Sequence, residues 1–254
     1  MEIMQSLIDK VREMRKADEE ESHQKIMVNG REGKIIMAES MADLFEQCLE
    51  ENLEMPSLPE LAIARIDADL ATRDGRILWK YNWMTGSALA RVSDGYSDEG
   101  VFIHYNPFKD DKDRILAYRR HSRSGGVPID YALDYAVSDC ISSEVDGKNI
   151  VAIPFWKIQE SPRGVIKIED VIKGGGHVVA RLAFGNDMEL LVRYIDRYIE
   201  VMKRSPFNPL EIGIWFSEDA VPSTMRPFEL GDSGIGIYNR NLTNKEYRAI
   251  GLKK

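Results

Sequence analysis

The chain has 254 residues, of which 43% are hydrophobic and 30% are charged, a composition that is typical of a folded globular protein and excludes a disordered chain. No apolar run approaches the ~18 residues of a membrane-spanning helix, so we expect no membrane partner. The formal net charge is −8, and the surplus lies in residues 1–60, where seven Lys/Arg stand against fifteen Asp/Glu; the balanced remainder lacks the basic excess of a dedicated nucleic-acid-binding protein.

Residues 1–16 have the pattern of an amphipathic helix, because their apolar side chains recur every three or four positions. The apolar stripe consists of Ile3, Met4, Leu7, Ile8, Val11 and Met14. It predicts a helix that packs either on the core of this chain or on a second copy, and we expect a homodimer through this helix. The acidic run at residues 18–21 then predicts a solvated linker.

The next segment predicts a hairpin and a second helix. Asn29-Gly30 lies between two short apolar stretches, and this dipeptide accepts the positive φ angles of a tight hairpin turn. Ser40 is followed three residues later by Asp43, a spacing that predicts the start of a helix.

Apolar residues alternate with period two from residue 77 onward. One face of this pattern carries Ile77, Trp79, Tyr81 and Trp83. With turn signals between its segments, the pattern predicts an antiparallel meander rich in aromatic residues over residues 77–121.

The second half of the chain mixes expected helices and strands. Helices are expected over residues 131–142 and 187–204, and a short final helix is expected to start near Thr243. Strands are expected near residues 150–158, 165–168, 177–184, 211–216 and 235–238.

Together these elements predict an α+β fold with a mainly antiparallel sheet and packed helices, preceded by a helical N-terminal region. Pro56 and Pro59 interrupt the pattern and mark the expected boundary. We therefore expect an acidic helical N-terminal region with a short hairpin over residues 1–60 and a main α+β domain over residues 61–254.

The chain contains two cysteines, Cys48 and Cys140, and each falls on an apolar helix face. This pattern predicts two buried thiols in a reducing compartment instead of a disulfide framework. The expected location is therefore cytoplasmic.

The strongest functional motif is the run Gly174-Gly175-Gly176-His177, which follows Lys173. Glycines lack a Cβ, so several backbone N–H groups of such a loop can converge on an anion, and nearby cations can add charge. The candidate substrate-binding residues are Arg163, Gly174, Gly175, Gly176, His177 and Arg181. The alternative interpretation is a flexible connector in front of a strand.

This loop resembles the second domain of the DHH-type phosphoesterases, which close their active site with a Gly-Gly-Gly-His loop. The resemblance covers residues 150–204, about a fifth of the chain, and includes Ala180 after the loop and Arg163 before it. It implies that the loop binds the phosphate of a substrate, while a separate Asp- and His-rich domain of that family holds manganese.

Few residues are candidates for a metal site. Asp67 and Asp69 are two positions apart, so on a strand both carboxylates project to one face, and His104 is the expected third ligand. Two carboxylates and a histidine suit Mn²⁺ or Mg²⁺. If the alanine-rich stretch after Pro59 is a helix, the two carboxylates point apart and are solvated surface groups.

The motifs predict a metal-assisted phosphoesterase or nucleotide-processing enzyme, whose partner is a phosphate-bearing small molecule or a short oligonucleotide. The metal would generate hydroxide and stabilise an in-line displacement. The alternative function is a non-catalytic module of a cytoplasmic assembly, which binds a partner protein or a nucleotide through the aromatic meander.

Overall fold

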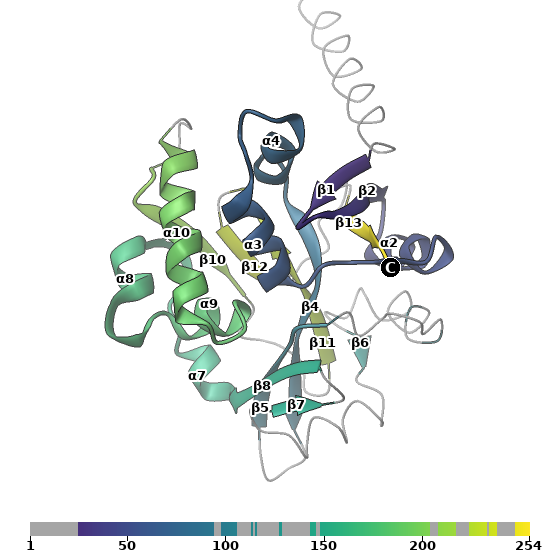
Figure 1. Cartoon of the computed structure of the whole chain (residues 1–254). Coiled ribbons are helices and arrows are strands. Elements are labelled where there is room, and N and C mark those ends of the chain that lie inside the picture. The colour runs from purple at the N-terminus through teal and green to yellow at the C-terminus, as the bar shows by residue number, and fades with distance from the viewer. Residues whose placement is uncertain are drawn as a thin grey trace, which may run out of the picture.

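The computed structural model describes residues 25–93, 98–105, 113, 115, 127–128, 143–145, 148–203, 208–216, 224–232, 234–237 and 247–254. These residues form one large sheet with helices packed on it (Figure 1). The helices predicted over residues 1–16 and 131–142 lie outside the described residues, as does Cys140. The homodimer expected through residues 1–16 therefore stays a prediction.

The main path of the sheet has the strand order β1-β2-β13-β4-β11-β12-β10-β9. Its members are β1 (Lys25–Val28), β2 (Arg31–Ala38), β4 (Trp83–Ser93), β9 (Gly164–Lys167), β10 (Glu211–Trp215), β11 (Thr224–Leu230), β12 (Gly234–Ile237) and β13 (Tyr247–Lys253). Off this path, β4 pairs with β5 (Asp98–Ile103), which pairs with β8 (Lys148–Pro154), which pairs with β7 (Ser143–Val145). Two short strands complete the sheet: β3 (Leu53–Glu54) beside β13 and β6 (Val127–Pro128) beside β11.

The sheet is mixed, so the expectation of a mainly antiparallel sheet is wrong, although the mixed α and β composition is confirmed. β13 pairs with β4 in parallel, and β10 pairs with β12 in parallel. Antiparallel neighbours such as β4 and β5 are joined by a short connection, which leaves a turn signal in the sequence. Parallel neighbours need long crossover connections, which leave no local signal.

Helices cover both faces of the sheet. Adjacent residues of a strand point to opposite faces, and on β2 Ile35 and Ile36 belong to two different cores. One core contains α3 (Leu58–Asp67), α4 (Arg73–Lys80), α7 (Phe155–Gln159), α8 (Ile168–Ile172), α9 (Val178–Ala183) and α10 (Met188–Met202). The other contains α2 (Met41–Glu50), which Figure 1 shows well apart from α3 and α10. No helix of the described residues is long and apolar enough to cross a membrane.

Local sequence signals are confirmed where a turn or cap decides the structure. β1 and β2 form the predicted hairpin, and Asn29 and Gly30 have φ angles of 49° and 75°, as a primed turn requires. The Ser40 side chain accepts a hydrogen bond from the Asp43 N–H and starts α2. Asp187 caps α10 in the same way through the N–H of Leu190.

The prediction that the meander begins with a strand at residue 77 is wrong, because residues 77–80 belong to α4. Thr72 accepts a hydrogen bond from the Gly75 N–H and starts this helix, and the strand β4 begins only at Trp83. The indole N–H of Trp79 donates to the carbonyl oxygen of Arg65 on α3, and both Trp79 and Trp83 are buried.

Two other predicted segments have the opposite secondary structure. The segment expected as a strand over residues 177–184 is α9, because His177 accepts the Ala180 N–H and caps a helix. The expected final helix is wrong, since the chain ends in β13, which pairs with β2 from Tyr247 to Leu252.

The sheet contains strands from both sides of the predicted boundary at residue 60. β2 lies on the N-terminal side of that boundary, and its antiparallel neighbour β13 lies at the far end of the chain. The division into residues 1–60 and 61–254 stays a prediction.

Candidate functional site

The glycine loop that we expected to bind an anion is folded on itself. Gly174, Gly175 and Gly176 all have positive φ angles, of 63°, 99° and 82°. The N–H of Gly176 donates to the carbonyl oxygen of Lys173, and the N–H of His177 donates to that of Val171 over 2.6 Å. Two of the donors expected to converge on an anion are therefore used within the loop.

His177 is engaged through both ring nitrogens. Its Nδ1 accepts a hydrogen bond from the Ala180 N–H over 3.3 Å, and its Nε2 donates to the carbonyl oxygen of Pro162 over 2.6 Å. The side chain is 5% exposed, and burial lowers the pKa of His177. These contacts require a neutral imidazole with its hydrogen on Nε2, and they tie the loop to the segment before β9.

The two predicted arginines lie beside this loop. Arg181 on α9 donates from Nη1 to the carbonyl oxygen of Gly175 over 3.1 Å. Arg163 is exposed and lies between Pro162 and the start of β9. The contacts of His177 and Arg181 are those of a structural turn, held to its helix and to the preceding loop.

The three predicted metal ligands are not brought together. Asp67 is the last residue of α3, and Asp69 lies in the loop that follows, so the helical alternative for this stretch is confirmed. His104 follows β5 and uses both ring nitrogens, since Nε2 donates to the Leu182 carbonyl oxygen over 2.8 Å and Nδ1 contacts the Ser87 hydroxyl at 3.2 Å. Burial lowers the pKa of His104 to about 4.

A metal role for Asp67 and Asp69 stays a prediction without a third ligand. Within the part of the chain that the structure describes, no three His, Cys, Asp or Glu residues form a group that could hold a metal ion. The neutral imidazole of His104 could ligate a metal only after breaking one of its two hydrogen bonds.

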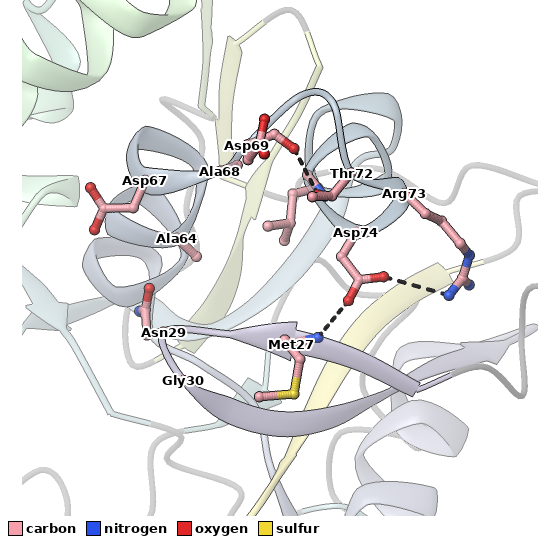
Figure 2. A pocket seen from close by; sticks show the side chains of 12 residues that line it. Met27, Asn29, Gly30, Ala64, Asp67, Ala68, Asp69, Thr72, Arg73 and Asp74 are labelled. Atoms are coloured by element: carbon pink, nitrogen blue, oxygen red, sulfur yellow. Dashed lines mark hydrogen bonds and ion pairs between the residues drawn. The ribbon is translucent and has the colours of Figure 1, made fainter.

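Asp67 and Asp69 do line a cavity of about 490 Å³ between the β1–β2 hairpin and the α3–α4 segment (Figure 2). The hairpin contributes Met27, Asn29 and Gly30. The helical segment contributes Ala64, Asp67, Ala68, Asp69, Thr72, Arg73, Asp74, Gly75 and Leu78. The sequence pattern identified the two carboxylates but not the hairpin across from them, which lies about forty residues upstream.

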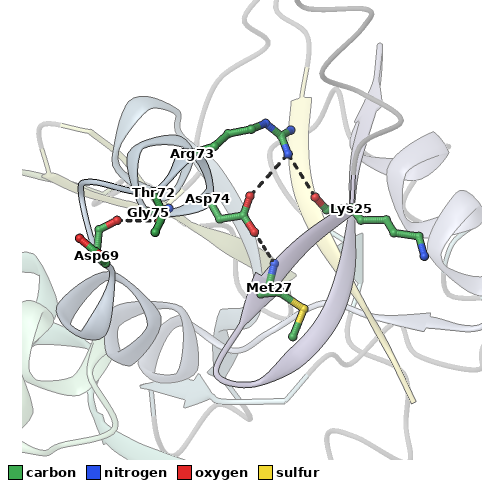
Figure 3. A network of polar contacts seen from close by, with 7 residues as sticks. All are labelled: Lys25, Met27, Asp69, Thr72, Arg73, Asp74 and Gly75. Atoms are coloured by element: carbon green, nitrogen blue, oxygen red, sulfur yellow. Dashed lines mark hydrogen bonds and ion pairs between the residues drawn. The ribbon is translucent and has the colours of Figure 1, made fainter.

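Polar contacts between the two segments, and within the α3–α4 segment, fix the walls of this cavity (Figure 3). The Asp74 carboxylate accepts a hydrogen bond from the backbone N–H of Met27 over 3.0 Å, which joins α4 to β1. The Thr72 hydroxyl donates to the carbonyl oxygen of Asp69 over 2.7 Å. A Cβ at Gly75 would lie 2.1 Å from that same oxygen, so only glycine allows α4 to start against the loop.

Cys48, the cysteine that the structure describes, is not an available nucleophile. Its side chain is buried on α2, and burial raises the pKa of its thiol to about 12. A thiol that stays protonated at neutral pH is inert.

Two exposed apolar side chains lie on neighbouring strands at one end of the strand order. Among the described residues, six large apolar side chains are exposed, and two of them, Val165 and Trp215, belong to β9 and β10. The other four are Met27 on β1, Trp156 on α7, Ile172 on α8 and Leu210 in the turn before β10. The aromatic residues that we expected at a binding surface, Trp79, Tyr81 and Trp83, are instead buried.

Val165 and Trp215 share one face of the sheet, because Val165 pairs with Gly213, two residues before Trp215, and we call this face the β9–β10 surface. Val165 is 65% exposed and Trp215 is 55% exposed. Val165 pairs with Gly213 of β10, and Trp215 pairs with Gly236 of β12. A Cβ at Gly164 would lie 3.9 Å from the Trp215 ring. The indole therefore lies beside Gly164, and its strand partner Gly236 has no side chain to cover it.

Comparison with solved structures gives the fold of this chain. Models of protein families and curated protein sequences give no match. A solved structure matches this chain with a TM-score of 0.69 and 19% sequence identity. It is described with the words "Accommodation of massive sequence variation in Nanoarchaeota by the C-type lectin fold". The match covers 89% of this chain and 100% of the other. At this identity the likeness shows the fold alone, and the fold is that of the C-type lectins.

This fold corrects the functional interpretation of the glycine loop. The predicted resemblance to the DHH-type phosphoesterases is wrong, because the match extends over most of the chain and belongs to the C-type lectin fold. The expectation of a phosphate-binding hydrolase, which rested on this resemblance, is wrong as well. The three glycines and His177 form a turn whose spacing matches the phosphoesterase motif only locally.

Proposed function

We propose that this protein is a non-catalytic binding module that holds a partner protein on the β9–β10 surface. The observation that carries the proposal is the pair of exposed apolar side chains, Val165 and Trp215, on one face of neighbouring strands. Scattered single apolar residues are normal on a protein surface, whereas adjacent ones can form an interaction site. Tryptophan is among the residues that contribute most to binding energy in protein interfaces.

The candidate catalytic groups of the described residues support a non-catalytic role. His104 and His177 are engaged through both ring nitrogens and held neutral, and the Cys48 thiol is buried. General acid–base catalysis needs a group that can reach a substrate and exchange a proton near neutral pH. These three groups meet neither condition. The buried thiol of Cys48 also favours a reducing, cytoplasmic location.

The fold likeness supports the same function. The matched structure is described as accommodating massive sequence variation, and a fold with this property suits a scaffold that presents a binding surface. In this chain the residues that face the core from β10, Ile212 and Ile214, are buried, whereas Trp215 at the end of the strand is exposed. The core contacts of β10 can therefore be kept while its outer residues change.

Affinity capture with matched variants tests this function. The immobilised parent, Trp215→Ser and Val165→Ser are incubated with extract of the source organism. Glu50→Ser serves as the control, because Glu50 is exposed on α2, which packs on β2 and β13 near the other end of the strand order. We expect the same partner to be retained by the parent and by Glu50→Ser and lost from the two β9–β10 variants. Equal retention by all four proteins, or no retained partner, contradicts the proposal; circular dichroism spectra establish that each variant is folded.

A further inference from the structure

The cavity between the β1–β2 hairpin and the α3–α4 segment lies apart from the β9–β10 surface and does not depend on it. Its volume of about 490 Å³ lies within the range of pockets that bind ligands in proteins. The geometry points to a pocket for the guanidinium group of an arginine side chain that a partner protein inserts here.

The inner wall of the cavity suits the apolar stem of an arginine. Ala64, Ala68 and Leu78 line it and are all buried in the core of the protein. Arginine buries its methylene groups along such a surface while its charged end stays near polar groups. A compact cation such as a metal ion gains nothing from these three side chains.

The rim of the cavity carries the charge that an arginine requires. Three carboxylates and one guanidinium line it, from Asp67, Asp69, Asp74 and Arg73. Asp74 is already bonded to the Met27 N–H, and Arg73 contacts Asp74 and the carbonyl oxygen of Lys25. The charges of Asp67 and Asp69 are left to attract a cation and to repel a phosphate.

Individual acceptor atoms at the rim remain available. Among the described residues none donates a hydrogen bond to the Asp67 carboxylate. Oδ1 of Asp69 accepts a hydrogen bond from the Ala71 N–H, and Oδ2 of the same carboxylate can still accept another. Asn29 donates from its amide nitrogen to the Glu60 carbonyl oxygen over 2.9 Å, so its amide oxygen can still accept. Figure 2 shows Asp67 and Asn29 on one side of the opening and Asp74 and Met27 on the other.

This distribution of acceptors fits a guanidinium better than an ammonium group. The planar guanidinium presents five N–H donors in a fixed fork and can bond acceptors on several sides at once. Hydrogen bonds between a guanidinium and a carboxylate are charge-assisted and among the stronger ones in proteins. Since Asp74–Met27 and Thr72–Asp69 already fix both walls, the pocket does not need to be ordered on binding.

The test uses the full chain and two probes of nearly equal shape, N-acetylarginine amide and N-acetylcitrulline amide, in which a neutral urea group replaces the charged guanidinium. Nuclear magnetic resonance titration follows the amide signals of the hairpin and of the α3–α4 loop. We expect saturable shifts at Asn29, Gly30 and Asp69 with the arginine probe and none with the citrulline probe. Asp67→Asn and Asp69→Asn keep the shape and the acceptor oxygen, and each is expected to weaken binding by roughly threefold.

Asp170→Asn is the control, because Asp170 is an exposed carboxylate on α8, outside the cavity. The inference is overturned by equal shifts with both probes, by no shift with the arginine probe, or by an equal loss of affinity in Asp170→Asn. An arginine-containing peptide that binds at least as tightly as the free probe supports a protein partner. Binding of the free probe but not of the peptide contradicts it and assigns the pocket to a small organic cation.

Discussion

The guanidinium Nη1 of Arg65 donates a hydrogen bond to the phenol oxygen of Tyr194 over 3.0 Å and joins α3 to α10. Arg65 is fully buried, and its other donors bond the carbonyl oxygens of Leu78, Tyr81, Leu230 and Gly231. The indole of Trp79 lies 5.1 Å from the guanidinium carbon and adds a cation–π contact. The side chain of Arg65 on α3 thus contacts three other elements: α10, the C-terminal end of α4 and the end of β11.

Arg65→Lys is expected to destabilise the fold by about 3 kcal/mol. An ammonium group cannot reach carbonyls on several sides, so buried acceptors of Tyr81 and Leu230 lose their donors. Tyr194→Phe removes only one of the five bonds and is expected to cost about 1 kcal/mol. Urea unfolding measures both values. A free energy of unfolding for Arg65→Lys within about 0.5 kcal/mol of the parent contradicts the role given to this residue.

The free energy of unfolding is expected to fall as the pH falls from about 6.5 to about 4. The pKa of His104 is about 4 in the folded protein and returns to its ordinary value of 6.5 in the unfolded chain. Between these values the unfolded chain binds more protons, so this contribution is fully present above pH 6.5 and is lost towards pH 4, by up to about 3 kcal/mol. Burial lowers the pKa of His177 and acts in the same direction.

Urea unfolding at about pH 7 and about pH 5 measures this dependence. The comparison protein is His104→Gln, which removes the titrating group. It is expected to be less stable than the parent at neutral pH and to lose less stability on acidification. Parallel pH profiles for the two proteins would exclude His104 as the cause.

Alanine substitutions in the glycine loop are expected to differ in cost. At Gly174 the φ angle is 63° and nothing lies within 4 Å of an added Cβ, so the cost is the left-handed backbone alone, about 1–2 kcal/mol. At Gly176 the φ angle is 82° and the Cβ would lie 2.7 Å from the sulfur of Met188, which adds steric strain. Thermal unfolding should therefore give a lower melting temperature for Gly176→Ala than for Gly174→Ala. The reverse order would contradict the packing of the loop on α10.

Sequence analysis predicted those parts of the fold that depend on neighbouring residues. The Asn29-Gly30 turn and the caps at Ser40 and Asp187 each act within four residues, and all three are confirmed. The segment around Trp79 was misassigned, because its apolar spacing fits a strand and its helical state depends on the Thr72 cap and on packing against Arg65. A strand at the chain end could not be found locally, since its partner β2 lies more than 200 residues upstream.

The candidate sites were harder to predict than the fold. The Asp67 and Asp69 pair was recognised, but its surroundings come from a hairpin that only the folded chain brings close. Val165 was placed correctly in a strand, yet alternation along a strand does not say which face is left uncovered. The composition of the glycine loop is that of an anion site. In the structure, however, the N–H groups of Gly176 and His177 donate to the carbonyl oxygens of Lys173 and Val171.

Site-specific photo-crosslinking tests the central claim most directly. A benzophenone amino acid replaces Trp215 in one protein and the exposed Glu50 of α2 in another, and both are irradiated in extract of the source organism. We predict a defined adduct with a partner protein from position 215 that is absent from position 50 and is lost when Val165→Asp is added. No adduct from position 215, or the same adducts from both positions, would contradict a binding function for the β9–β10 surface.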